Sequence, residues 1–193
     1  MSNDFNPEHD LFTPERWPLS VLRSSHFPFL KKVSALALQL DGVTAGDADL
    51  DAELQTIFTK FSRLVPSIPD PEAGRPAYNR LTWDLRAITR MIPANVQLEL
   101  KQDSLPDPDG DCQWHASLFQ QPSPEQGHAS LLPQNASLFY GSSNYGIAWT
   151  PNVAITRILL AGFILGVIQR IQSGTVGMRS TDDEPTARLL ASA

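Results

Sequence analysis

Apolar residues dominate the segment from Thr150 to Gln172, TPNVAITRILLAGFILGVIQRIQ. Its only formal charges are Arg157 and Arg170, and eleven of the twelve residues between them are apolar or glycine, the exception being Gln169. Thr150 is a suitable N-cap and Pro151 a suitable first helical residue, so the pattern predicts a helix. Because this helix is apolar nearly all round, we expect neighbours on most of its sides. A bilayer span needs about 20 apolar residues, so the shorter run between the arginines favours a protein interior over a membrane.

Three further helices are predicted by apolar residues that recur at three- and four-residue spacing. Their ranges are 28–40, 48–64 and 76–92. Turn residues or prolines follow each range, as is typical of helix ends.

The region 94–149 has a different composition, with five prolines and many serine, glutamine and aspartate residues. Within it, the alternating segment 96–100 predicts a short strand, and 137–140 is a second candidate. The polar tail 180–193 is expected to be mobile. The sequence therefore predicts one mainly α-helical domain over 1–193, a four-helix bundle. Its helical core covers 28–92 and 150–173, with a long irregular insert at 94–149.

Charged residues are few, and those of like charge cluster along the sequence. Charged residues make up 19% of the chain, against about 25% in typical soluble domains, and the formal net charge is −6. Residues 75–101 carry five basic and two acidic side chains, and 151–181 carry three arginines and no acid. The acidic segment 103–125 separates them. Sparse charge favours a protein that covers its surface with copies of itself, and its basic segments could still bind an anionic partner.

Recognisable catalytic and metal-binding patterns are missing from the sequence. An EF-hand calcium loop needs glycine at its sixth position and glutamate at its twelfth, but counted from Asp107 these positions are Cys112 and Leu118. The spacing of Cys112, His115 and His128 matches no zinc site, so we expect no metal, no cofactor and no catalytic residue. A single cysteine forms no intrachain disulfide, and the acidic N-terminus has no apolar signal region, which favours an intracellular location.

One stripe of the predicted helix 76–92 combines an amide, an aromatic ring and two guanidinium groups. Its members follow one another at i, i+4, i+7 and i+11: Asn79, Trp83, Arg86 and Arg90. Such a stripe could hold phosphates and stack on a base, so we take it as a candidate RNA-binding surface. The alternative is a solvated helix face with an Arg80–Asp84 ion pair.

Three segments of the predicted helices and their approaches are informative by their order along the chain: Val21-Leu-Arg-Ser-Ser-His-Phe-Pro-Phe-Leu, Leu54-Gln-Thr-Ile-Phe-Thr-Lys-Phe-Ser-Arg-Leu-Val and Val153-Ala-Ile-Thr-Arg157. In order and composition they resemble segments of the coat proteins of rod-shaped plant viruses of the tobacco mosaic type. The resemblance implies a four-helix bundle that assembles into a helical tube around single-stranded RNA. It also implies phosphate contacts by arginines of the radial helices, which by position are Arg86, Arg90 and Arg157. A shell protein of an icosahedral double-stranded RNA virus is a related alternative.

The leading functional hypothesis is therefore a non-enzymatic viral coat subunit that self-assembles and packages viral RNA, without a membrane partner. Its expected locations are the virion and the host cytoplasm. Gly162, Phe163 and Gly166 are the candidate contacts between subunits, because the glycines allow another helix to approach closely. Two alternatives stay open: a cellular all-α adaptor protein, and a small enzyme that uses Cys112 and His115.

Overall fold

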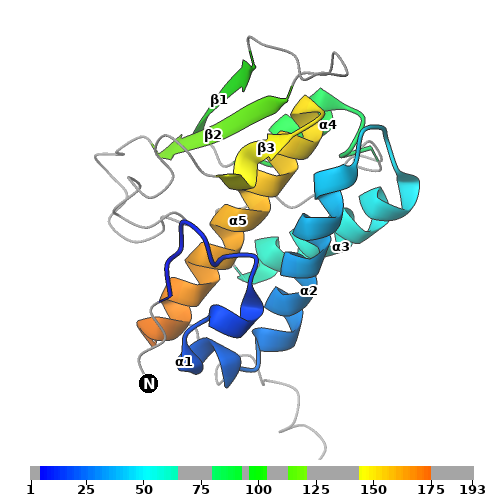
Figure 1. Ribbon diagram of the computed structural model, residues 1–193. Coiled ribbons are helices and arrows are strands. Elements are labelled where there is room, and N and C mark those ends of the chain that lie inside the picture. The colour runs from blue at the N-terminus through cyan, green and yellow to red at the C-terminus, as the bar shows by residue number, and fades with distance from the viewer. Residues whose placement is uncertain (1–4, 65–79, 93–95, 104–112, 121–143, 175–193) are drawn as a thin grey trace, which may run out of the picture.

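A long central helix organises the fold. The computed structural model describes residues 5–64, 80–92, 96–103, 113–120 and 144–174. Helix α5 (Pro151–Gln172) runs through the middle of the molecule (Figure 1). It begins as predicted: Pro151 occupies its first turn, and the Thr150 side chain accepts a hydrogen bond from the Val153 amide at 3.3 Å. Every residue from 152 to 168 is buried, which confirms that this helix has neighbours on all sides.

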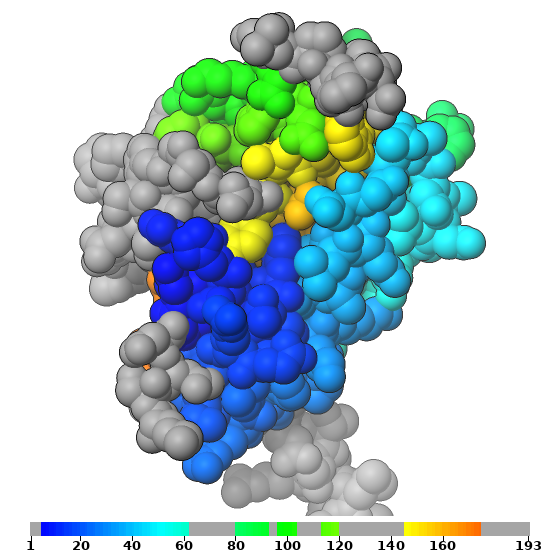
Figure 2. Space-filling model, viewed as in Figure 1, coloured from blue at the N-terminus to red at the C-terminus, as the bar shows by residue number. Residues whose placement is uncertain are grey.

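Other helices cover one side of α5. Helices α2 (Phe27–Gln39) and α3 (Ala48–Leu64) lie on that side, and the short α4 (Leu85–Thr89) contacts α5 near its N-terminal end (Figure 1). Helix α1 (Leu19–Leu22) and the 3-10 turns η1 (Pro14–Arg16), η2 (Leu40–Gly42) and η5 (Asn144–Gly146) complete the helical elements. The space-filling view shows that little of α5 reaches the surface on this face (Figure 2).

A three-stranded antiparallel sheet covers the opposite side of α5. Its strands are β1 (Val96–Gln102), β2 (Trp114–Gln120) and β3 (Ile147–Ala148), in the order β1-β2-β3. Leu98 pairs with Leu118, and Trp114 pairs with Ala148. Strand β2 contacts α5 and buries Ala116 and Leu118. The sheet therefore shields the apolar surface of α5 that the other helices leave uncovered.

The predicted four-helix bundle is wrong, because all three described strands come from the region 94–149 that the sequence assigned to an irregular insert. The predicted strand 96–100 is confirmed and extends to Gln102. Strand β2 was missed, although apolar residues alternate at 114, 116 and 118 as expected for a half-buried strand. The candidate strand 137–140 and the tail 180–193 lie outside the described residues.

Two of the three other predicted helices agree closely with the structure. Helix α2 is shifted by one residue and α3 matches its predicted bounds. The predicted helix 76–92 is wrong within the described residues, where only α4 is helical together with a turn at 80–83. Asp84 has an extended backbone, with φ −101° and ψ 106°, and its carboxylate accepts a hydrogen bond from the Arg86 amide at 2.8 Å. Asp84 is therefore the N-cap of a short helix and not an interior helical residue.

By length and composition, α5 could cross a membrane. It is the only such helix in the part of the chain that the structure describes, with a mean hydropathy of 1.8 over its most apolar window. However, 94% of that window is buried inside the fold. The apolar sequence of α5 is thus explained by its place in the protein core.

Candidate nucleic-acid interface

Three hydrogen bonds anchor the turn before α4 to distant parts of the fold. The Thr82 amide donates to Asp51 Oδ1 at 2.7 Å, and the Asp47 amide donates to Thr82 Oγ1 at 3.0 Å. Asn152 Nδ2, in the first turn of α5, donates to the Leu81 carbonyl at 3.3 Å. Leu81 and Thr82 are buried, so the turn is fixed against both α3 and α5.

This anchored turn presents Trp83 to solvent. The residue is 56% exposed, which is unusual for a large apolar side chain. Its indole lies directly against Gly46, because a Cβ atom built there would come within 2.0 to 2.2 Å of three ring atoms. The neighbouring Leu85 is also 41% exposed. The Trp83 ring is therefore supported on one side by Gly46, while much of the ring surface stays exposed to solvent.

Three arginines surround Trp83 in the sequence, and all are exposed: Arg80, Arg86 and Arg90. No ion pair joins any of them to an acidic side chain among the described residues. The alternative Arg80–Asp84 pair is not formed, and the Asp84 carboxylate instead caps α4. Arg86 lies within α4 and Arg90 is its C-cap, whereas Trp83 precedes the helix. Because Trp83 precedes α4, the helical spacing from Trp83 to Arg86 and Arg90 is not preserved, and Asn79 lies outside the described residues.

Arg157 lies in a different environment from the other predicted RNA-binding arginines. It is only 6% exposed, so it cannot form part of the exposed surface around Trp83. Its Nη1 atom donates to Asp41 Oδ1 and, at 2.6 Å, to the Ile147 carbonyl. The structure therefore gives Arg157 a structural ion pair that links α5 to η2 and β3.

The predicted subunit contacts also lie inside the fold. Gly162, Phe163 and Gly166 are all buried within a single copy of the chain. The Phe163 ring contacts Phe58 and Phe61 of α3, with ring centroids 5.7 and 5.0 Å apart. The helix that packs against Phe163 is thus α3 of the same chain.

The histidine of the enzyme alternative contacts an acidic side chain. His115 Nε2 lies 2.8 Å from Asp103 Oδ1, and both side chains are partly exposed. Cys112 and His128 lie outside the described residues, so no thiol is placed beside this pair. Groups of three or more potential metal ligands do not occur among the residues that the structure describes.

One of the groups that anchor this turn, the Asp51 carboxyl, is buried and titratable. The residue is 1% exposed, and burial raises the pKa of its carboxyl group, assisted by the nearby charge of Asp47 and opposed by the hydrogen bonds from Thr82. Its second oxygen, Oδ2, has no hydrogen-bond partner among the described residues. A buried carboxylate in this setting destabilises the folded chain in its charged form.

We therefore expect Asp51→Asn to gain stability relative to wild type as the pH rises. The pKa of Asp51 is higher in the folded than in the unfolded chain, so the wild type loses stability as pH rises above 3.8 toward the raised pKa. Asparagine keeps the acceptor for the Thr82 amide and has no charge. Asp51→Ala should cost about 1–3 kcal/mol, because it leaves that buried amide without a partner. Urea unfolding of the three proteins between acidic and neutral pH tests this, and a pH-independent difference between wild type and Asp51→Asn would contradict it.

The signals for this interface were only partly visible in the sequence. Trp83, Arg86 and Arg90 were identified, but the anchoring residues Asp51 and Thr82 were not, because the bond between them spans 31 positions. No protein-family model, no curated protein and no solved structure matches this chain.

Proposed function

We propose that the protein is a non-enzymatic RNA-binding subunit that works in a homo-oligomer, and that its role is that of a viral coat protein. The observation that carries this proposal is the exposed Trp83 on an anchored turn, close in sequence to three exposed arginines that have no acidic partner within the described part of the chain. An aromatic face stacks on unpaired bases of any sequence, and guanidinium groups bind phosphates. Together they suit single-stranded RNA without sequence preference.

Self-assembly is supported by the surface composition. Charged residues are few for a domain of this size, and four large apolar side chains are exposed among the residues that the structure describes: Leu19, Leu38, Trp83 and Leu85. One subunit offers only a small number of phosphate contacts, so its affinity for RNA is expected to be low. Copies arranged along one RNA would bind it jointly, because each further contact becomes intramolecular. The proposal does not extend to the helical tube that the resemblance implies, because that tube is built from four-helix bundles and this chain is not one.

Replacing Trp83 with alanine is expected to weaken binding to a single-stranded RNA oligonucleotide by about 1–3 kcal/mol, the typical contribution of one stacked base. The Arg86→Ala/Arg90→Ala variant should also weaken binding, and should reduce the dependence of log K on log salt by about 0.7 for each phosphate that is no longer bound. Fluorescence anisotropy over a range of salt concentrations measures both quantities. Arg23→Ala, at an exposed arginine outside this surface, is the matched control and should bind as wild type does.

Gly46→Ala tests whether the position of the ring matters. An alanine Cβ would overlap the indole, so Trp83 must move, although no residue that faces RNA is changed. We expect weaker RNA binding with an unchanged circular dichroism spectrum. Wild-type affinity in both Gly46→Ala and Trp83→Ala would contradict the RNA-binding proposal. Sedimentation that shows a monomer at all concentrations, with RNA present, would contradict the coat role.

A further inference from the structure

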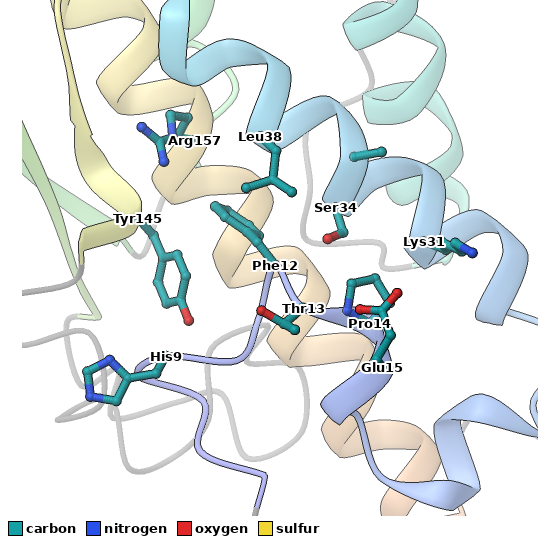
Figure 3. Close-up of a pocket in the computed structure, with 11 residues that line it drawn as sticks. His9, Phe12, Thr13, Pro14, Glu15, Lys31, Ser34, Leu38, Tyr145 and Arg157 are labelled. Carbon is teal, nitrogen blue, oxygen red and sulfur yellow. The ribbon is translucent and has the colours of Figure 1, made fainter.

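A groove of about 590 Å³ lies on the face of the fold where the N-terminal segment crosses α2 (Figure 3). One face of α2 forms its wall, through residues at i, i+3, i+4 and i+7: Lys31, Ser34, Ala35 and Leu38. Residues 12–15 and His9 form the opposite wall, and Tyr145 and Arg157 complete the lining. Its volume falls within the range of small-molecule sites, and its lining is predominantly apolar.

The walls of the groove are held firmly in place. The Leu11 amide donates to the Tyr145 hydroxyl at 3.0 Å, and the Phe12 ring packs edge-on against Tyr145 at 4.7 Å. Buried Trp17 donates from Nε1 to the Asp10 and Leu11 carbonyls. Burial also raises the pKa of the Tyr145 hydroxyl to about 12. The N-terminal segment is therefore a fixed wall of the groove.

Two buried polar side chains of the groove have unused hydrogen-bonding groups. Ser34 is fully buried, and its Oγ has no partner among the described residues. The Arg157 guanidinium has five N–H donors, yet its hydrogen bonds within the described structure involve only Nη1. Buried charged groups are normally paired and fully hydrogen-bonded. The Nε–Nη2 edge of an arginine commonly binds a carboxylate through two parallel bonds, and the Nε of Arg157 is shielded from solvent in the free protein.

The charges around Arg157 favour a ligand with a single negative charge. Its one ionic partner in the described structure, Asp41, has a side chain that is 68% exposed, so water screens part of that negative charge and the buried cation is not fully neutralised. Lys31 also lines the groove, but its ammonium group points away from it (Figure 3). Glu15 adds a negative charge to the lining. One incompletely neutralised cation suits a carboxylate better than a doubly charged phosphate.

We propose that this groove binds an amphipathic monocarboxylate, with its acidic group at Arg157 and its apolar body along Phe12 and Leu38. Leu38 is 53% exposed, and the ring of Phe12 lies beside it in the groove (Figure 3). An apolar body placed there would cover Leu38, and the carboxylate would use the free donors of Arg157. This binding is independent of the RNA-binding surface around Trp83.

Calorimetric titration of the full chain with decanoate, 1-decanol and inorganic phosphate tests the proposal. Decanoate should bind about tenfold or more tightly than decanol, because only the carboxylate forms charge-assisted hydrogen bonds. Phosphate should not bind measurably. No binding of decanoate at millimolar concentration, equal affinities for decanoate and decanol, or phosphate binding as tight as that of decanoate would overturn the proposal.

Two variants locate the site. Leu38→Glu places a like charge in the groove and should weaken decanoate binding about tenfold or more. Leu19→Glu is the matched control, because Leu19 is equally exposed at 53% and does not line the groove. Arg157→Met should reduce decanoate affinity to that of decanol. Wild-type affinity for decanoate in Leu38→Glu, or an equal loss in Leu19→Glu, would overturn the assignment. Binding of a short RNA oligonucleotide by the monomer, which does not depend on assembly, should be the same in Leu38→Glu and wild type. This test and that of the RNA surface therefore fail separately.

Discussion

Phe163→Ala is expected to destabilise the folded monomer by about 3–5 kcal/mol, the usual cost of truncating a buried phenylalanine. The side chain is 3% exposed and its ring contacts Phe58 and Phe61, so truncation removes packing between α5 and α3 and leaves a cavity. Such a loss is a large fraction of the stability of a typical domain. Urea unfolding followed by circular dichroism measures it.

The dependence on protein concentration separates the two roles considered for Phe163. A core residue gives the same loss of stability at every protein concentration, because only one chain is involved. A subunit contact gives a loss that grows with concentration in the range where the wild type associates. Leu19→Ala, at an exposed apolar residue, should change stability by no more than about 0.5 kcal/mol. A concentration-dependent effect of Phe163→Ala would restore the predicted interface.

Sequence periodicity predicted α2, α3 and α5 well because each has a long apolar pattern with clear end signals. It failed for 76–92, where the apolar spacing continues through Asp84 but the carboxylate of that residue caps a new helix. Strand β2 was hidden among prolines and polar residues, although its own alternation was regular. Because α5 is apolar on all sides, its sequence predicted that other parts of the protein cover it. The sequence could not predict whether the covering element is a sheet, a helix or another subunit.

The candidate sites were predicted only where local sequence determines exposure. Trp83, Arg86 and Arg90 are exposed as expected, because they lie on or beside a short surface helix. Arg157 was expected at the RNA but is buried, since its partners Asp41 and Ile147 lie 116 and 10 positions away. The groove was not predicted either, because it depends on where the N-terminal segment crosses α2.

Asp41→Ala is expected to cost about 3 kcal/mol, the lower end of the range for removing one partner of a buried ion pair. The lower end applies because Asp41 is largely exposed, whereas Arg157 would be left as a buried cation without a counterion in the described structure. Arg157→Met keeps an apolar stem of similar length and removes the charge. It loses the hydrogen bond to the Ile147 carbonyl, so its expected cost is about 1 kcal/mol.

The double variant Asp41→Ala/Arg157→Met should therefore be more stable than Asp41→Ala alone by about 2 kcal/mol, which urea unfolding of the full cycle would measure. Equal stability of these two proteins would mean that solvent already compensates the cation. If Arg157 does bind carboxylates in the groove, decanoate supplies the negative charge that Asp41→Ala lacks. Decanoate should then stabilise Asp41→Ala more than wild type, and should stabilise the double variant no more than decanol does.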